Sequence, residues 1–164
     1  TGAEVLAEAD AHGLMHFLFA CYGGGCPAED NFTAQKTQLM PNPITARVPQ
    51  ALLKKGALAV LAHIDRAWAY SFQSTAGRSQ YQGFRSVMNP ILNGDPIGQA
   101  TDSFNQKWSV LGADLQEILR DRAQNPGIIS DIVLANRWVA RDDARNYIIL
   151  GDPAARLRVK DMSV

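Results

Sequence analysis

One cysteine lies where an apolar segment meets a run of glycines. Residues 14–20 are almost all apolar, Cys21 follows them, and Gly23, Gly24 and Gly25 come after Tyr22. A cysteine thiolate is a nucleophile, glycines permit unusual backbone angles and the close approach of a substrate, and backbone N–H groups there could stabilise an oxyanion. The segment therefore predicts Cys21 as a nucleophile; the alternative is a buried structural cysteine.

A nucleophilic thiol needs a base, and the chain has three histidines. His12 precedes the strand predicted for residues 14–20, and a seven-residue strand spans roughly 23 Å, so His12 is expected at the end opposite Cys21. His16 lies inside that strand. His63 follows a second apolar run and is the histidine whose placement suits a dyad with Cys21, although a histidine that only lines the site is the alternative.

A metal site is not expected. Cys21, Cys26 and His63 could in principle bind a metal ion, but their spacing matches no standard zinc pattern. No other cofactor is indicated.

The elements that would position these residues follow from the hydrophobic pattern. Short apolar runs at residues 14–20, 57–62 and 147–150 predict buried strands, and residues 156–160 alternate like an edge strand. A short helix is predicted before the first strand, at residues 4–10, and helical spacing predicts helices between the strands, at residues 49–55, 84–92, 100–118 and 129–141. Asn93-Gly94 is typical of a helix C-terminus. Strands separated by helices indicate an α/β fold with a mostly parallel sheet.

In open α/β sheets the active site lies beyond the carboxyl ends of the strands. Those ends carry Cys21, then His63 with Asp65, then Asp152, so all are expected around one site. Asp65 would attract a basic substrate side chain, or instead pair with a cation such as Arg66. For Asp152 a structural turn is the favoured interpretation.

Composition limits the class of protein. With 164 residues, 46% hydrophobic and 20% charged, the chain is expected to form a single domain over residues 1–164. Its formal net charge of zero argues against nucleic acid or an anionic membrane as a general partner. Two cysteines are too few for a disulfide framework, and a cytoplasmic location is expected.

Three segments together resemble the caspase-fold (clan CD) cysteine peptidases of the CHAT and gingipain-like families. They are Phe-Leu-Phe-Ala-Cys-Tyr-Gly-Gly-Gly at residues 17–25, Gly-Ala-Leu-Ala-Val-Leu-Ala-His-Ile-Asp-Arg-Ala-Trp at 56–68, and Asn-Tyr-Ile-Ile-Leu-Gly-Asp-Pro at 146–153. The resemblance implies a caspase-like three-layer sandwich, with a mostly parallel sheet and helices on both faces. The chain would be the C-terminal, cysteine-bearing part of that domain, with the N-terminal part of the sheet missing.

The resemblance also implies roles. Cys21 would be the nucleophile of an endopeptidase, its N–H would contribute to the oxyanion hole, and His63, Asp65 and Trp68 would line the substrate pocket. The histidine of the dyad belongs to a His-Gly pair on a preceding strand. His12-Gly13 lies too close to Cys21 to be that pair, so this histidine is expected from outside the chain.

Three readings of the sequence follow. In the first, a protein or peptide is the substrate, and the partner is the N-terminal half of the same domain or another subunit. In the second, the chain is a non-catalytic caspase-like regulatory or protein-interaction domain. In the third, it is an unrelated thiol enzyme with a Cys21–His63 dyad.

Overall fold

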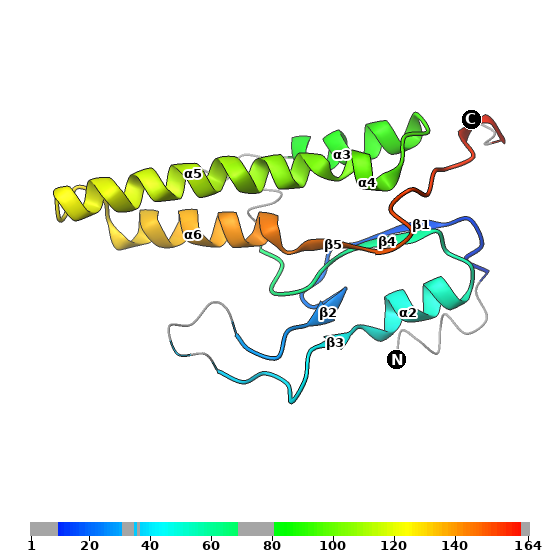
Figure 1. The fold of residues 1–164 in the computed structure, drawn as a ribbon, viewed down its shortest axis with the longest axis horizontal. Helices are drawn as coiled ribbons and strands as arrows, with labels where there is room; N and C mark the ends of the chain where they lie inside the picture. The colour runs from blue at the N-terminus through cyan, green and yellow to red at the C-terminus, as the bar shows by residue number, and fades with distance from the viewer. Residues whose placement is uncertain (1–9, 31–34, 36, 69–80, 162–164) are drawn as a thin grey trace.

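The computed structural model describes residues 10–30, 35, 37–68 and 81–161, and its centre is a small mixed sheet with helices on both faces (Figure 1). The sheet has the strand order β1 (Met15–Leu18), β4 (Ala59–His63), β5 (Tyr147–Gly151). β1 is parallel to β4, and β5 is antiparallel to it. A separate antiparallel ribbon joins β2 (Gly25–Cys26) to β3 (Ile44–Thr45).

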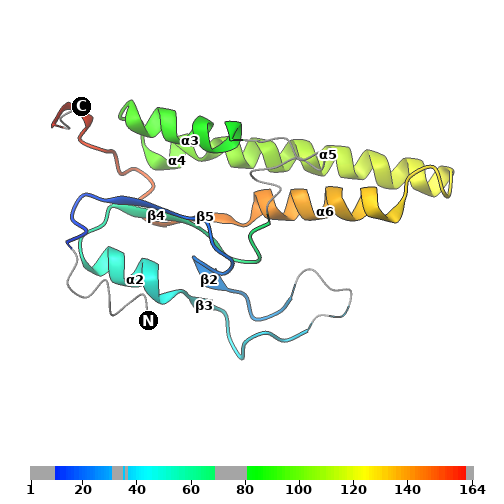
Figure 2. The ribbon, with the colours of Figure 1, turned by 180° about the vertical axis from the view of Figure 1, so that it is seen from behind.

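Helices cover the two faces of the sheet unequally (Figures 1 and 2). One face carries α2 (Arg47–Lys54). The other carries α3 (Gln82–Leu92), α4 (Ile97–Ala100) and the start of α5 (Asp102–Gln124). α6 (Asp131–Arg145) packs along α5 as a hairpin that extends well beyond the sheet, and a short 3-10 turn, η2 (Val159–Asp161), follows β5. No helix in the described part of the chain is both long and apolar enough to cross a membrane.

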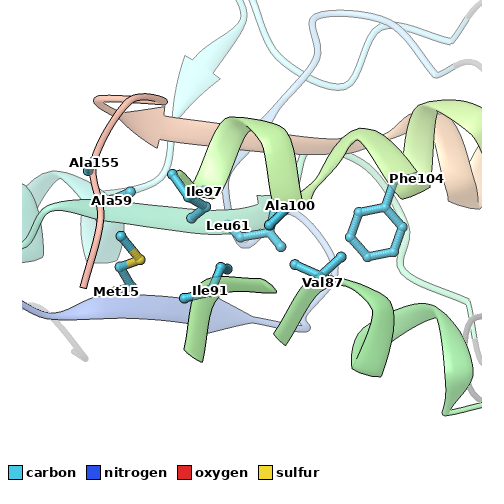
Figure 3. Packing of buried hydrophobic residues seen from close by; sticks show 9 residues of the cluster. All are labelled: Met15, Ala59, Leu61, Val87, Ile91, Ile97, Ala100, Phe104 and Ala155. Carbon is cyan, nitrogen blue, oxygen red and sulfur yellow. The ribbon is translucent and has the colours of Figure 1, made fainter. Parts of the chain in front are cut away.

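β4 is the centre of the core because all five of its residues are buried. Its side chains alternate between the faces, as the two-residue period of a strand requires. Ala59 and Leu61 belong to the cluster under α3, α4 and α5, whereas Val60 and Ala62 pack towards α2. Figure 3 shows the first cluster, whose other buried members are Met15, Val87, Ile91, Ile97, Ala100, Phe104 and Ala155.

The α/β class, the positions of three strands and the helices between them were predicted correctly. The expected C-terminus at Asn93-Gly94 is confirmed, since Gly94 has φ +89° after α3. α2 begins at Arg47, two residues before the expected start at Pro49; a proline in the first turn is tolerated because the N–H groups there lack intrahelical partners. The helix expected at residues 4–10 falls almost entirely outside the described residues.

Two predictions about the sheet were wrong. The described sheet is not mostly parallel, because β5 is antiparallel to β4. The α5–α6 hairpin returns the chain to the carboxyl end of β4, so that β5 begins there with Tyr147 paired to His63. Residues 156–160 are not an edge strand. Arg156 instead donates from Nη1 to the carbonyl of Gly94 at 2.8 Å, and the chain then turns into η2.

Candidate active site

The carboxyl ends of β1 and β4 lie next to each other at one end of the sheet. Their parallel register pairs Leu18 with Ala62, so Cys21 and the segment 63–68 follow at that same end. Asp152 does not join them, contrary to expectation, because antiparallel β5 places Gly151 beside Ala59 at the opposite edge. Asp152 closes a turn there, its Oδ1 accepting the N–H of Ala154 at 2.8 Å.

Cys21 occupies the centre of a tight turn. The N–H of Gly23 donates to the carbonyl of Ala20 at 3.0 Å, which leaves Cys21 and Tyr22 as the two central residues. Tyr22 has φ +57° and is the only non-glycine residue with positive φ in the part of the chain that the structure describes. This conformation costs an L-residue about 1–2 kcal/mol. The turn leaves the Cys21 side chain exposed, and the Cys21 N–H has no acceptor among the described residues.

The glycines after the turn serve close packing against the chain itself. None of Gly23, Gly24 and Gly25 has positive φ, so the unusual backbone angle expected of them belongs to Tyr22 instead. A Cβ on Gly25 would lie 2.4 Å from the carbonyl oxygen of Ile44 in β3, a separation that a real Cβ does not adopt. The glycine run therefore lets the turn continue into the β2–β3 ribbon.

Backbone hydrogen bonds tie the turn to the segment after β4. The N–H of Tyr22 donates to the carbonyl of Asp65 at 2.9 Å, and the N–H of Gly24 donates to the carbonyl of His63 at 2.8 Å. The Cys21 thiol lies 3.8 Å from the carbonyl oxygen of Ala67. These contacts fix where the thiol stands.

His63 is fully buried, and both of its ring nitrogens have partners. Nδ1 lies 2.9 Å from the carbonyl oxygen of Asp65, and Nε2 lies 3.1 Å from the carbonyl oxygen and 3.4 Å from Oδ1 of Asp143. Burial alone would lower the pKa of His63, but the hydrogen bonds to Asp143 and Asp65 and the charge of Asp143 raise it overall. With its ring nitrogens engaged in this way, His63 forms no dyad with Cys21.

Asp65 and Trp68 also belong to the segment that supports the turn. Asp65 is 1% exposed; its Oδ1 accepts the N–H of Arg66 at 2.7 Å, and its Oδ2 has no partner among the described residues. Trp68 has an exposed side chain, and its backbone N–H donates to Oδ1 of Asp143 at 2.8 Å. Since His63 and Asp65 are covered in this structure, contact with substrate stays a prediction for both and requires the cover to open.

The Arg66 side chain pairs with Asp30 and not with the adjacent Asp65. Its guanidinium forms a bidentate pair with Asp30, at 2.7 Å and 2.6 Å, and this pair raises the pKa of Arg66. The pair fastens the loop before residue 31 to the segment behind Cys21. Cys26, in contrast to Cys21, is half-buried and donates its thiol to the Pro27 carbonyl at 3.4 Å, and burial raises the pKa of that thiol.

The other two histidines lie away from the turn. His12 is next to Gly13, whose N–H bonds the carbonyl of Gly56 at the amino ends of β1 and β4, as predicted. His16 lies within β1, opposite Val60. Within the described residues, no group of three or more His, Cys, Asp or Glu side chains could hold a metal ion.

Sequence reasoning missed Asp143, which contacts both His63 and Trp68. Asp142 and Asp143 are buried near the end of α6, where they follow Val139 and Ala140 on a helix with an apolar face. An acidic pair that continues an apolar face is the signal that could have found it, because a buried carboxylate needs partners.

Comparisons of the chain with protein-family models, with curated proteins and with solved structures found no match.

Proposed function

We propose that this chain carries the nucleophile of a cysteine endopeptidase, and that the nucleophile is Cys21. The observation that carries the proposal is the exposed thiol in a turn with a left-handed residue, at the carboxyl ends of two parallel strands. Backbone strain held in place by surrounding hydrogen bonds is concentrated at functional sites in proteins. The same edge of an α/β sheet is where active sites form.

The reaction follows from the groups at the turn. A base removes the thiol proton of Cys21, and the thiolate attacks the peptide carbonyl carbon to form a C–S bond. The Cys21 N–H, which has no acceptor among the described residues, would donate to the oxyanion. The C–N bond then breaks as the protonated base gives its proton to the leaving amine. Water hydrolyses the thioester, which returns the thiol and releases the acid.

The base must come from outside the chain in this proposal. His12 lies at the far edge of the sheet, His16 lies within β1, and His63 is buried with both ring nitrogens engaged. β1 pairs only with β4 among the described strands, so its second edge can accept a further strand. A strand added there in parallel would end beside Cys21. This supports the proposed caspase-like sheet, continued beyond β1 by the N-terminal half of the domain or by another subunit, with a histidine at its end.

The pocket is the second part of the proposal. Two side chains lie next to the turn: Asp65, whose buried Oδ2 has no hydrogen-bond partner in the described part of the chain, and the exposed Trp68. If Asp65 receives a basic side chain, Asp65→Ala will reduce cleavage after Arg and Lys. Unchanged cleavage after Arg and Lys would reject this role for Asp65 without affecting the assignment of Cys21.

A peptidase assay tests the assignment of the nucleophile. The intact protein is incubated with a library of fluorogenic peptides, and hydrolysis should disappear in Cys21→Ala and persist in Cys26→Ala, the matched control. Activity that survives Cys21→Ala would refute the proposal.

A non-catalytic regulatory or protein-interaction domain is the second candidate. It is favoured by one observation, that none of the chain's histidines is placed to act on Cys21. A protein that binds peptides but cleaves none of them, with or without Cys21, would support it.

A further inference from the structure

A buried pair, His63 and Asp143, lies next to the segment that supports the Cys21 turn. His63 is 0% exposed and Asp143 is 1% exposed. Nε2 of His63 faces both the backbone carbonyl and the carboxylate of Asp143, at 3.1 Å and 3.4 Å. Nδ1 faces the carbonyl of Asp65 at 2.9 Å, closer than the Asp65 N–H at 3.3 Å. Because oxygen acceptors face both nitrogens, a ring protonated at both positions satisfies them best.

Groups from β5, α5 and α6 surround the pair. The rings of His63 and of Tyr147 in β5 lie nearly perpendicular, with centroids 5.0 Å apart at 89°. α6 contributes Asp143 and α5 contributes Lys107. Burial lowers the pKa of Lys107, and the charge of Asp143 acts in the opposite direction. Asp65, on the segment that follows β4, is a further acidic residue next to His63. An imidazolium at His63 would therefore have the buried Asp143 carboxylate as its counter-ion.

The pair is connected to the turn by two short paths. The His63 carbonyl accepts the N–H of Gly24, and the Asp65 carbonyl accepts the N–H of Tyr22 while facing the His63 ring. Asp143 also holds the other end of this segment, through the N–H of Trp68 at 2.8 Å. One carboxylate on α6 thus fixes both ends of residues 63–68, against which the strained Tyr22 is held.

We propose that Asp143 is a positioning residue for Cys21: its carboxylate, paired with a His63 imidazolium, holds the segment 63–68 and thereby the left-handed turn that presents the thiol. Its relevance to catalysis rests on the proposed peptidase function, but the positioning itself does not. Asp142 provides a matched control. It is equally buried, yet its described contacts are with Arg141 of the same helix, whose Nε donates at 2.9 Å.

Amide hydrogen exchange of the intact protein tests the positioning. In Asp143→Asn, exchange of the peptide covering residues 20–25 should be at least tenfold faster than in the wild type, while Asp142→Asn should leave it unchanged within twofold. Equal protection of residues 20–25 in Asp143→Asn and the wild type would overturn the inference. So would an equal loss of protection in both variants, because it would indicate a general effect of losing a buried charge.

A spectroscopic readout needs no variant, in case Asp143→Asn fails to fold. Nitrogen-15 NMR of the wild-type protein at pH 6.5 should show both ring nitrogens of His63 protonated. A neutral His63 ring at that pH would overturn the proposal, because the ion pair would then not exist.

Kinetics separate this inference from the proposed function. Asp143→Asn should lower kcat at least tenfold with KM within twofold of the wild type, and Asp142→Asn should change neither. A wild-type protein without any peptidase activity would refute the proposed function, while the exchange result would still decide the role of Asp143. A wild-type kcat in Asp143→Asn would overturn the inference alone.

Discussion

Replacing a residue by glycine usually destabilises a protein more than replacing it by alanine. The left-handed conformation of Tyr22 reverses this order, so that Tyr22→Gly should be more stable than Tyr22→Ala. Tyr22→Ala and Tyr22→Gly delete the same aromatic ring, but only alanine keeps a Cβ at φ +57°. That conformation costs a residue with a Cβ about 1–2 kcal/mol. The greater backbone freedom of glycine in the unfolded state costs about 0.5–1 kcal/mol. The midpoints of these two ranges differ by about 0.75 kcal/mol, in favour of Tyr22→Gly.

Urea denaturation measures this difference, with the two variants compared at equal m-values. Ala113→Gly is the control, because Ala113 is exposed within α5, where glycine should be about 1 kcal/mol less stable than alanine. We expect the difference in unfolding free energy between the glycine and the alanine form to have opposite signs at positions 22 and 113. If Tyr22→Ala is as stable as Tyr22→Gly or more stable, the turn after Cys21 is not left-handed and the argument from strain fails.

Three further perturbations probe the core, the loop pair and the buried histidine. Ile91→Ala should cost about 2–5 kcal/mol in unfolding free energy because Ile91 is 1% exposed, whereas Leu92→Ala, at 51% exposure, should cost less than about 0.5 kcal/mol; equal losses by urea denaturation would contradict the core in Figure 3. Arg66→Met should cost about 1.5–3 kcal/mol in the same assay, because it removes the bidentate guanidinium pair of the buried Asp30 carboxylate, and a change near zero would refute a stabilising role for the pair. The pKa of His63 is raised in the folded state, so the stability that its protonation contributes should be complete below the unfolded pKa of about 6.5 and be lost as pH rises through the higher folded pKa. The thermal unfolding temperatures of the wild type and His63→Gln, measured from pH 5 to 9, should therefore converge towards high pH. A constant difference between them would contradict the ion pair.

The parts of the fold that follow from local pattern could be predicted from the sequence. Residues 57–62 read as a buried strand because both faces of β4 are covered by helices. The meeting of Cys21 with the segment after His63 followed from the rule that parallel strands end at one edge. The position of Asp152 could not be obtained in this way, because the direction of β5 depends on how the α5–α6 hairpin returns the chain.

Within the site, the unpredicted features depend on contacts between segments distant in the sequence. Tyr22 is held at positive φ by an oxygen of Asp65, although tyrosine has no intrinsic preference for that conformation. Asp143 reaches His63 across 80 positions of sequence, and no local pattern reports such a pair. The bidentate partner of Arg66 is likewise Asp30 rather than its neighbour Asp65, since a bidentate pair requires two carboxylate oxygens facing the guanidinium.

The rate at which the Cys21 thiol is labelled tests most directly whether Cys21 is a nucleophile. The intact protein is treated with a peptide-based thiol electrophile, and the labelling rates of Cys21 and Cys26 are measured separately after digestion, in the folded protein and in urea. The account predicts that folded Cys21 reacts at least tenfold faster than both Cys26 and the same cysteine in the unfolded chain. If Cys21 reacts no faster in the folded protein than in the unfolded one, the folded site does not produce an activated nucleophile and the peptidase proposal is wrong.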